Sequence, residues 1–183
     1  RWILNDVTGK AIRAWDNRGH TFRTAYDVLR RPLRKFVVGA DPIRPNEEIL
    51  TERLLYGEQH PETEHRNLRG KLHLHFDQAG IAGVEAHDFK GNPLQATRRL
   101  SKEYKKALDW HAADAALPTD STVPFSSATL EASISPLLEN EIFASLTQYD
   151  ALNRPVLLTT PHTPEMRPYT LRPGYNEANL LER

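Results

Sequence analysis

Short runs of apolar and polar residues follow one another along the chain, and one turn-forming pattern ends many of them. Six runs close with an aromatic or histidine residue that is followed directly by an acid or its amide. The six pairs are Trp15-Asp16, Tyr26-Asp27, Phe76-Asp77, His87-Asp88, Tyr149-Asp150 and Tyr175-Asn176. Twice the next pair follows after 11 residues, the length of one short strand and one turn. The pattern predicts a mainly β protein whose strands form an antiparallel meander of hairpins.

The residue three positions after each acid favours a tight reversal of the chain. In five of the six copies it is Gly or Asn, which adopt positive φ readily. These residues are Gly19, Gly80, Gly91, Asn153 and Asn179, and the sixth is Arg30. In a type I turn followed by a bulge, the acid accepts backbone N–H groups and the fourth residue is left-handed. We therefore expect all six acids or amides to form hairpin turns, with the Arg30 turn differing from the rest. Proline follows two residues after that position in three copies, at Pro32, Pro93 and Pro155.

Two stretches between the repeats carry helix signals. Asn46 can cap a helix over 47–56, because acidic residues fill its first turn and Gly57 stands just past its end. A second helix is expected over about 101–116, where apolar residues recur at helical spacing. That stripe consists of Leu100, Tyr104, Leu108, His111 and Ala115. We expect these helices to lie on the sheet or to be inserted between hairpins.

No stretch of the sequence looks like a linker between domains. Residues 57–67 are polar and residues 117–127 are rich in Pro, Ser and Thr, so both are expected to be loops. Residues 1–183 are expected to form one continuous β-sheet segment. Because the sequence does not begin with Met, we expect it to be a fragment of a larger chain.

The composition argues against several classes of function. Lys and Arg total 24 and Asp and Glu also total 24, so the chain lacks the basic excess of a nucleic-acid-coating protein. It contains no Cys, which excludes disulfides, zinc-thiolate and iron–sulfur sites and Cys nucleophiles. No apolar run approaches the roughly 20 residues that span a bilayer. We therefore expect no cofactor, no nucleic-acid partner and no membrane-spanning segment.

The aromatic–acid turn resembles the YD repeat of Rhs proteins, the recombination-hot-spot family. Residues 149–155 look like a standard copy, and residues 67–100 are similar to the Rhs-repeat region of insecticidal toxin complex proteins, the B and C components of Tc toxins. The motifs of that run are Asn67-Leu68-Arg69-Gly70-Lys71-Leu72, Phe76-Asp77-Gln78-Ala79-Gly80, Asp88-Phe89-Lys90-Gly91-Asn92-Pro93-Leu94 and Arg98-Arg99-Leu100. Residues 175–183 look like the same region, so the resemblance covers roughly residues 10–183.

The resemblance implies a structural role. In such proteins the repeats build a β-sheet that spirals into a hollow shell around a C-terminal toxic polypeptide, which an aspartyl autoprotease can release. This chain would be a piece of the shell wall, and we find no match to the autoprotease or to a toxin in it. The implied partners are the rest of the parent chain, the enclosed toxin and other toxin-complex subunits. The implied location is the bacterial cytoplasm before export, followed by secretion within a toxin complex.

A metal-dependent hydrolase is an alternative interpretation. Alternate residues of a strand share one face, so His73, His75 and Asp77 could converge on a metal ion. Their spacing is similar to the His-x-His-x-Asp motif of metallo-β-lactamase-like hydrolases, in which a His follows the Asp. Here Gln78 stands in that position, and Asp77 already belongs to the turn pattern. We therefore favour the structural interpretation over catalysis.

Other candidate sites have weaker signals. Tryptophans and tyrosines could form a platform for a carbohydrate- or cell-surface-binding module, although aromatic residues at strand ends more often serve packing. No Gly-x-Ser-x-Gly elbow and no phosphate-binding loop occurs. The remaining candidates are the serines Ser126, Ser127, Ser133 and Ser135, the acidic pairs Glu47/Glu48 and Glu139/Glu141, and the basic residues Arg30, Arg31, Arg34 and Lys35. We expect all of these to be structural or solvated residues.

Overall fold

A computed structural model describes residues 1–120 and 123–182. Eleven strands form one sheet in which each strand pairs antiparallel with its neighbours in sequence. The strands are β1 (Trp2–Asn5), β2 (Ala11–Trp15), β3 (Thr21–Tyr26), β4 (Pro32–Val38), β5 (Glu48–Tyr56), β6 (Leu72–Asp77), β7 (Gly80–His87), β8 (Pro93–Ser101), β9 (Leu138–Tyr149), β10 (Pro155–His162) and β11 (Thr170–Leu171). The prediction of a mainly β antiparallel meander is confirmed.

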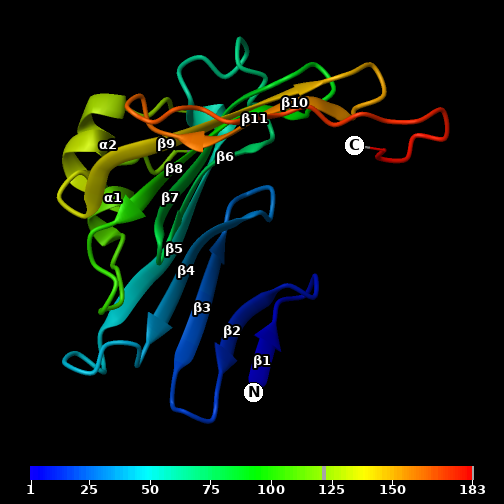
Figure 1. Cartoon of the computed structure of the whole chain (residues 1–183). Coiled ribbons are helices and arrows are strands. Elements are labelled where there is room, and N and C mark those ends of the chain that lie inside the picture. Colours follow the sequence, from blue (N-terminus) through cyan, green and yellow to red (C-terminus); the bar gives the residue numbers. More distant parts are fainter. Residues whose placement is uncertain (121–122, 183) are drawn as a thin grey trace.

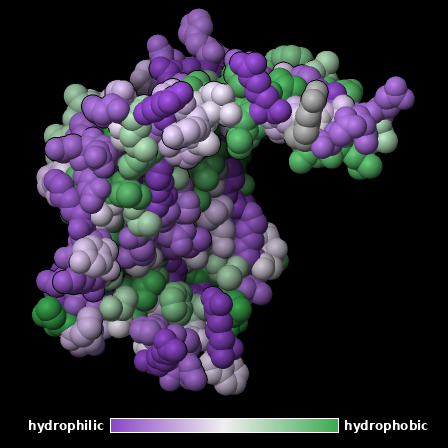
Figure 2. All heavy atoms as spheres, viewed as in Figure 1, coloured by the Kyte–Doolittle hydropathy of each residue, from purple (hydrophilic) through white to green (hydrophobic). Residues whose placement is uncertain are grey.

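The sheet twists and curls so strongly that it encloses a hollow on one side. Strands β1–β5 run steeply in Figure 1, whereas β9, β10 and β11 cross the top of the molecule. Figure 2 shows the C-terminal part projecting over the hollow. We call the surface toward the hollow the concave face and the opposite surface, which carries α1 and α2, the helix-bearing face.

The main hydrophobic core lies on the helix-bearing face, beneath residues 102–137, which connect β8 to β9. We call this connection the insertion. It contains α1 (His111–Ala115) and α2 (Ser127–Ile134), and Ser121 and Thr122 within it lie outside the described residues. Trp110 is fully buried there, with its ring edge-on to Phe76 at 5.2 Å between centroids. The insertion thus covers apolar side chains of the sheet that a single open sheet cannot bury alone.

The helix expected over 47–56 is wrong, because these residues form the central strand β5 between β4 and β6. Leu50 and Leu55 are fully buried under the insertion, and Ile49 pairs with Val37 across the sheet. A short apolar run flanked by Asn and Gly fits a buried strand as well as a helix. Strand pairing on both edges decides between the two, since it satisfies the backbone N–H and C=O groups.

The helix expected over 101–116 is also wrong, except for the five residues of α1. Ser101 ends β8, and an irregular segment follows it. The sheet itself satisfies this backbone, because the N–H groups of Leu108 and Trp110 donate to Gln78 and to the carbonyl of Leu50. The expected loop over 117–127 is followed by a helix that the sequence analysis missed, α2. Ser126 caps it by accepting the N–H of Thr129 at 3.3 Å.

Among the described residues, no helix has the length and apolar character that crossing a membrane requires.

Candidate functional site

The acid-led turns are the most regular feature of the molecule. Turns at Asp6, Asp27, Asp88, Asp150 and Asn176 lie along one margin of the sheet, which we call the turn rim (Figure 1). Asp16 and Asp77 form turns at the opposite margin. In each turn except that of Asp77, the backbone N–H of the acid or amide donates to the carbonyl four positions later, and its own carbonyl accepts the N–H of the third residue after it. All of these turns except that of Asn176 connect neighbouring antiparallel strands. The Asn176 turn lies in the segment after β11.

The side-chain oxygen of each leading residue satisfies the backbone of its own turn. Oδ1 of Asp16 accepts the N–H groups of Arg18 and His20 at 2.9 and 3.0 Å. Asp6, Asp88, Asp150 and Asn176 repeat this two-bond pattern at the same spacing. Left-handed residues follow at the third position, as in a type I turn with a bulge. These are Gly9, Gly19, Arg30, Gly91, Asn153 and Asn179, with φ between 62° and 89°.

Arg30 takes the same left-handed conformation, with φ 63°, so the expectation that its turn would differ is wrong. The Asp27 turn closes with the usual bonds, from the Asp27 N–H to the Arg31 carbonyl and from the Arg30 N–H to the Asp27 carbonyl, both 2.9 Å. A left-handed non-glycine residue costs about 1–2 kcal/mol. The Arg30 guanidinium offsets that cost, since it pairs with Asp6 and donates to Thr8 in the neighbouring turn.

The Asp77 turn is the one with a different geometry. Asp77 pairs directly with Gly80, so only Gln78 and Ala79 form the loop, and Gly80 has φ 125°. Asp77 still accepts the N–H of Ala79 at 2.7 Å through Oδ1. Both carboxylate oxygens also accept from the Arg98 guanidinium, at 2.8 and 2.9 Å.

Neighbouring turns of the rim are joined to one another by side chains. Arg31 reaches Glu58 in the β5–β6 connection at 2.8 Å, and Arg154 donates to the Asn179 side chain at 2.7 Å. The remaining links are Lys10 to the Arg30 carbonyl, Lys90 to the Ala151 carbonyl and Asn92 to Asn153. The rim is therefore a continuous row of turns, so each hairpin stabilises the next.

Three tyrosines reinforce this row in the same way. Each hydroxyl donates to the carbonyl five residues after the acid of the preceding turn on the rim. Each ring lies beneath the cation four residues after that acid. The hydrogen bonds join Tyr26 to Ala11 (2.8 Å), Tyr56 to Pro32 (3.1 Å) and Tyr175 to Pro155 (3.0 Å). The cations are Lys10, Arg31 and Arg154, at 5.6, 3.9 and 4.7 Å from the ring centroids. This contact gives the tyrosine a role in joining consecutive hairpins.

Replacing Tyr56 with Phe is expected to lower the free energy of unfolding by about 1 kcal/mol, because the ring stays under Arg31 but the hydroxyl bond to Pro32 is lost. Chemical denaturation of the purified protein measures the change. Tyr104, which is 82% exposed, provides the matched control as Tyr104→Phe and should leave stability within experimental error. Equal effects of the two substitutions would contradict a joining role for Tyr56.

Replacing Asp27 with Ala is expected to cost about 1–2 kcal/mol of unfolding free energy. Its carboxylate is 4% exposed and accepts the backbone N–H and the Nε–H of Arg31, both at 2.7 Å. Asp27→Asn keeps an oxygen for the backbone donor, as Asn176 does naturally, so it should cost distinctly less than Ala. Thermal unfolding of both variants tests this, and an Asn variant as unstable as the Ala variant would contradict it.

Contacts within the turns also lower the pKa of two of the turn carboxyls. The Arg154 N–H holds the pKa of the Asp150 carboxyl below its usual value, and the His20 ring does the same to the pKa of Asp16. Ionisation of both carboxyls therefore stabilises the folded protein at pH values above their usual pKa of about 3.9. That contribution is lost as the pH falls through the lowered values in the folded protein.

The structure does not bring the predicted metal ligands together. A bulge makes His73 an extra residue, because Leu55 pairs with Leu74 but Tyr56 pairs with Leu72. The His73 ring accordingly stacks against Phe125 of the insertion, and its Nδ1 donates to the Val84 carbonyl. His75 contacts Glu52 at 3.1 Å, and Asp77 binds Arg98. Within residues 1–120 and 123–182, no group of three His, Asp or Glu side chains is placed to hold a metal ion.

Several of the other candidate residues also have structural partners. Ser126 caps α2, and Glu47 and Glu48 pair with Arg44 and Arg23. Each residue of the basic run has an acidic partner: Arg30 with Asp6, Arg31 with Asp27, Arg34 with Asp114 and Lys35 with Glu52. Trp110 is buried in the core, which removes it from any exposed aromatic platform.

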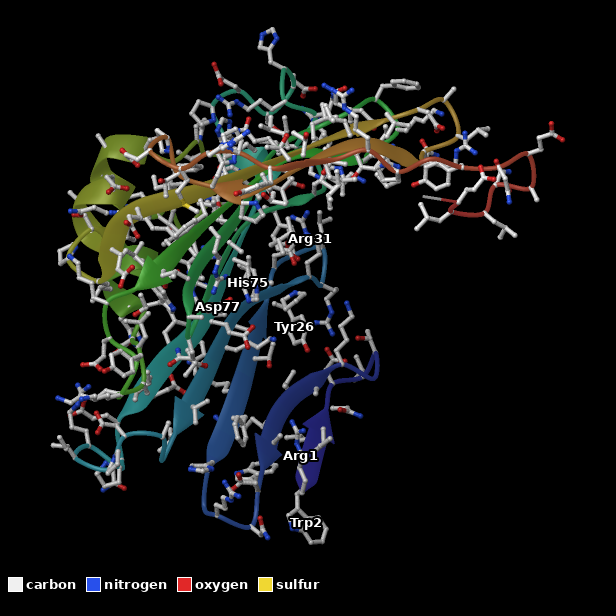
Figure 3. The ribbon with its side chains drawn as sticks, in the orientation of Figure 1. Arg1, Trp2, Tyr26, Arg31, His75 and Asp77 are labelled. Atoms are coloured by element: carbon white, nitrogen blue, oxygen red, sulfur yellow. The ribbon has the colours of Figure 1, made fainter. Side chains whose placement is uncertain are left out.

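The concave face carries charged side chains that neutralise one another across the strands. Lys35 donates to Glu52 at 2.8 Å, and Glu52 also contacts His75. Asp77 and Arg98 continue this arrangement from β6 to β8, and Figure 3 shows His75 and Asp77 pointing toward the hollow. Beside them lies a shallow, mostly apolar groove of about 400 Å³. Leu72, Ala82, Val84, Ala96, Phe143 and Pro161 are among its lining residues.

Comparison with known proteins finds a relative among toxin subunits. The chain is 26% identical to toxin subunit YenC2 of Yersinia entomophaga over 172 residues, which cover 86% of the chain. The chain resembles a toxin-complex subunit. It spans only 16% of the length of that relative. No family model matches the sequence.

Solved toxin-complex structures share the fold. A crystal structure of TcdB2-TccC3-TEV superposes with a TM-score of 0.74 at 20% identity, over 98% of this chain and 7% of that chain. The Photorhabdus luminescens Tc holotoxin pore, with a TccC3 mutation, gives a TM-score of 0.75 at 21% identity with the same coverage. The resemblance to the Rhs-repeat region of Tc toxin components, inferred from the sequence, is confirmed.

The sequence analysis missed one turn of the rim. Asp6 and Gly9 have the usual spacing and bonds, but Asn5 precedes them in place of an aromatic residue. A search for Asp followed by Gly three residues later would have found this copy.

Proposed function

We propose that this chain is a segment of the β-sheet wall of a toxin-complex protein, and that the wall encloses a C-terminal toxic polypeptide. The segment contains and shields this cargo and performs no catalysis. The observation that carries the proposal is the row of linked turns along one curved sheet, together with the likeness to the toxin subunit. Repetition of one hairpin unit allows such a sheet to be extended by further units.

The two edge strands of the sheet support a place within a larger wall. Strands β1 and β11 each have one partner strand and one free edge within the described residues. Trp2 and Ile3 of β1 are 78% and 55% exposed, although apolar edge strands are normally covered or paired. The proposed neighbours are further strands of the parent chain, which would pair with β1 and β11.

The concave face suits an inner surface. Lys35 pairs with Glu52 and Arg98 with Asp77 on this face, so these charges neutralise one another rather than attract or repel a cargo. The insertion covers the opposite face, which the proposal places outside. Partners in this account are the rest of the parent chain, the enclosed polypeptide and the other subunits of a secreted toxin complex.

Cysteine labelling of the intact parent protein tests the enclosure, because this chain contributes no Cys of its own. Ala96→Cys places a thiol in the groove of the concave face, and Glu131→Cys places one on exposed α2. The account predicts that a small maleimide labels both positions, while a 5 kDa polyethylene glycol maleimide labels only position 131. Mass spectrometry of the peptides reads out the labelling. Rapid labelling of position 96 by the large reagent would contradict enclosure.

A further inference from the structure

Three histidines gather where the β5–β6 connection and the insertion meet the sheet. The ring centroids of His60 and His73 are 4.8 Å apart, and both rings contact Phe125, at 5.9 and 6.2 Å. His87 ends β7 nearby, and His73 and His87 are only 4% and 8% exposed. We call His60, His73 and His87 the histidine corner.

Hydrogen bonding at His60 and burial at His73 and His87 favour neutral rings in the corner. Nδ1 of His60 accepts the N–H of Glu62 at 3.0 Å, so a proton added at that nitrogen would face a donor. Nδ1 of His73 donates to the Val84 carbonyl at 2.9 Å, which leaves Nε2 as the nitrogen without a proton in the neutral ring. Nδ1 of His87 is buried without a hydrogen-bond partner. A second proton on any of these rings therefore breaks a bond or charges a buried site.

The groups around the corner are mixed in charge. The nearest acids are Glu62 beside His60, Glu85 on β7 and Asp88 beside His87. Glu85 also accepts from Thr97 and contacts Arg66. Arg66 and Lys71 oppose protonation from the β5–β6 connection, and the facing pair of Arg99 on β8 and Glu131 on α2 is joined at 2.7 Å. Glu62 pairs with Arg66 and Asp88 accepts from Asn92, so each of these three acids already has another partner.

We propose that the histidine corner is an acid-sensitive latch, whose protonation releases the β5–β6 connection and the Phe125 segment from the helix-bearing face. The attachments that would open include three hydrogen bonds beside the rings. The Phe125 N–H donates to the Gln59 carbonyl at 2.9 Å, and the His87 N–H donates to the Arg66 carbonyl at 3.0 Å. Asn67 adds one side-chain bond to the His87 carbonyl. This property is separate from the wall function, since it concerns the outer covering of the sheet.

The direction of the pH effect follows from burial. Loss of solvation lowers the pKa of all three rings below the usual value of about 6.5. The open corner therefore binds protons more readily than the closed one. The latch is fully closed above pH 6.5 and weakens as the pH falls below it.

Hydrogen exchange of the intact protein at pH 7.5 and pH 5.0, corrected for intrinsic rates, tests the latch. Amides in residues 57–71 and 123–134 should exchange about tenfold faster at the lower pH, because the open corner binds protons more readily than the closed one. Amides of β4, which contains no histidine, should change far less. Equal corrected rates in the corner at the two pH values would overturn the proposal.

Non-titrating variants assign the effect to the three rings. In the triple variant, His60→Asn keeps an acceptor for Glu62, His73→Asn keeps a donor for Val84, and His87→Phe fills the buried slot. This variant should lose the acceleration, whereas the exposed control His65→Asn should keep it. Acceleration that persists in the triple variant, or disappears in the control, would refute the assignment. Should the triple variant not fold, His60→Asn alone is expected to reduce the acceleration, and unchanged acceleration in it would refute the proposal.

Discussion

Replacing Asp114 with Ala is expected to lower the free energy of unfolding by about 3–5 kcal/mol, the cost of leaving a buried charge without its partner. The Arg53 side chain is 2% exposed, and its Nε donates to Asp114 at 2.7 Å. Asp114 also binds Arg34 at 2.8 Å, so one carboxylate of α1 ties the insertion to β4 and β5. Burial lowers the pKa of Arg53, although Asp114 opposes this effect. Urea denaturation followed by circular dichroism measures the loss.

Two further variants identify the cause of that loss. Arg53→Met combined with Asp114→Leu removes both charges and should recover most of the stability, since an apolar pair can replace a buried ion pair. Glu47→Ala removes an exposed partner of Arg44 and should cost less than about 1 kcal/mol. A double variant as unstable as Asp114→Ala would contradict the account.

Replacing Gly80 with Ala is expected to cost about 3 kcal/mol or more. Gly80 has φ 125°, which side-chain-bearing residues rarely adopt, and an added Cβ would lie 2.1 Å from the Arg99 carbonyl oxygen. That oxygen belongs to the backbone of β8, so relief requires the strand to move. Thermal unfolding should show a large drop in midpoint, with weaker protection of β7 and β8 amides in hydrogen exchange.

Gly19→Ala is the matched control, because it has φ 86° but open space around the added Cβ. It should cost about 1–2 kcal/mol, the penalty for a left-handed residue alone. A loss in Gly80→Ala no larger than that in Gly19→Ala would show that φ alone matters, which would contradict the close approach of β8.

The turns were predictable because their chemistry is local. An acid, two backbone donors and a left-handed residue lie within five positions of one another, so sequence spacing carries the information. Arg30 shows the limit of this reasoning. Its left-handed conformation is supported by Asp6, which is 24 residues away in the chain but adjacent on the turn rim.

The helix predictions failed for the opposite reason, since distant partners decide those segments. Strand β5 is flanked by residue types that commonly cap helices, but its pairing with β4 and β6 is not visible in its own sequence. Leu108 belongs to the expected helical stripe, yet Leu108 and Trp110 both reach the core from irregular backbone held by Gln78 and Leu50. Tertiary contacts override local propensity in both cases.

The candidate metal site depended on an unbroken strand. Three residues at alternate positions share a face only if no bulge intervenes, and the bulge at His73 is set by the pairing of β5 with β6. The histidine corner could not be predicted from the sequence either, because His60, His73 and His87 come from separate elements. Nothing in their spacing along the chain indicates that they meet.

A density map of the intact toxin-complex protein that contains this chain tests the central claim most directly. The account predicts that β1 and β11 both pair with further strands and that the concave face, including Arg98 and Phe143, lines a closed volume. A map in which both edge strands are unpaired and the concave face is open to solvent would contradict it.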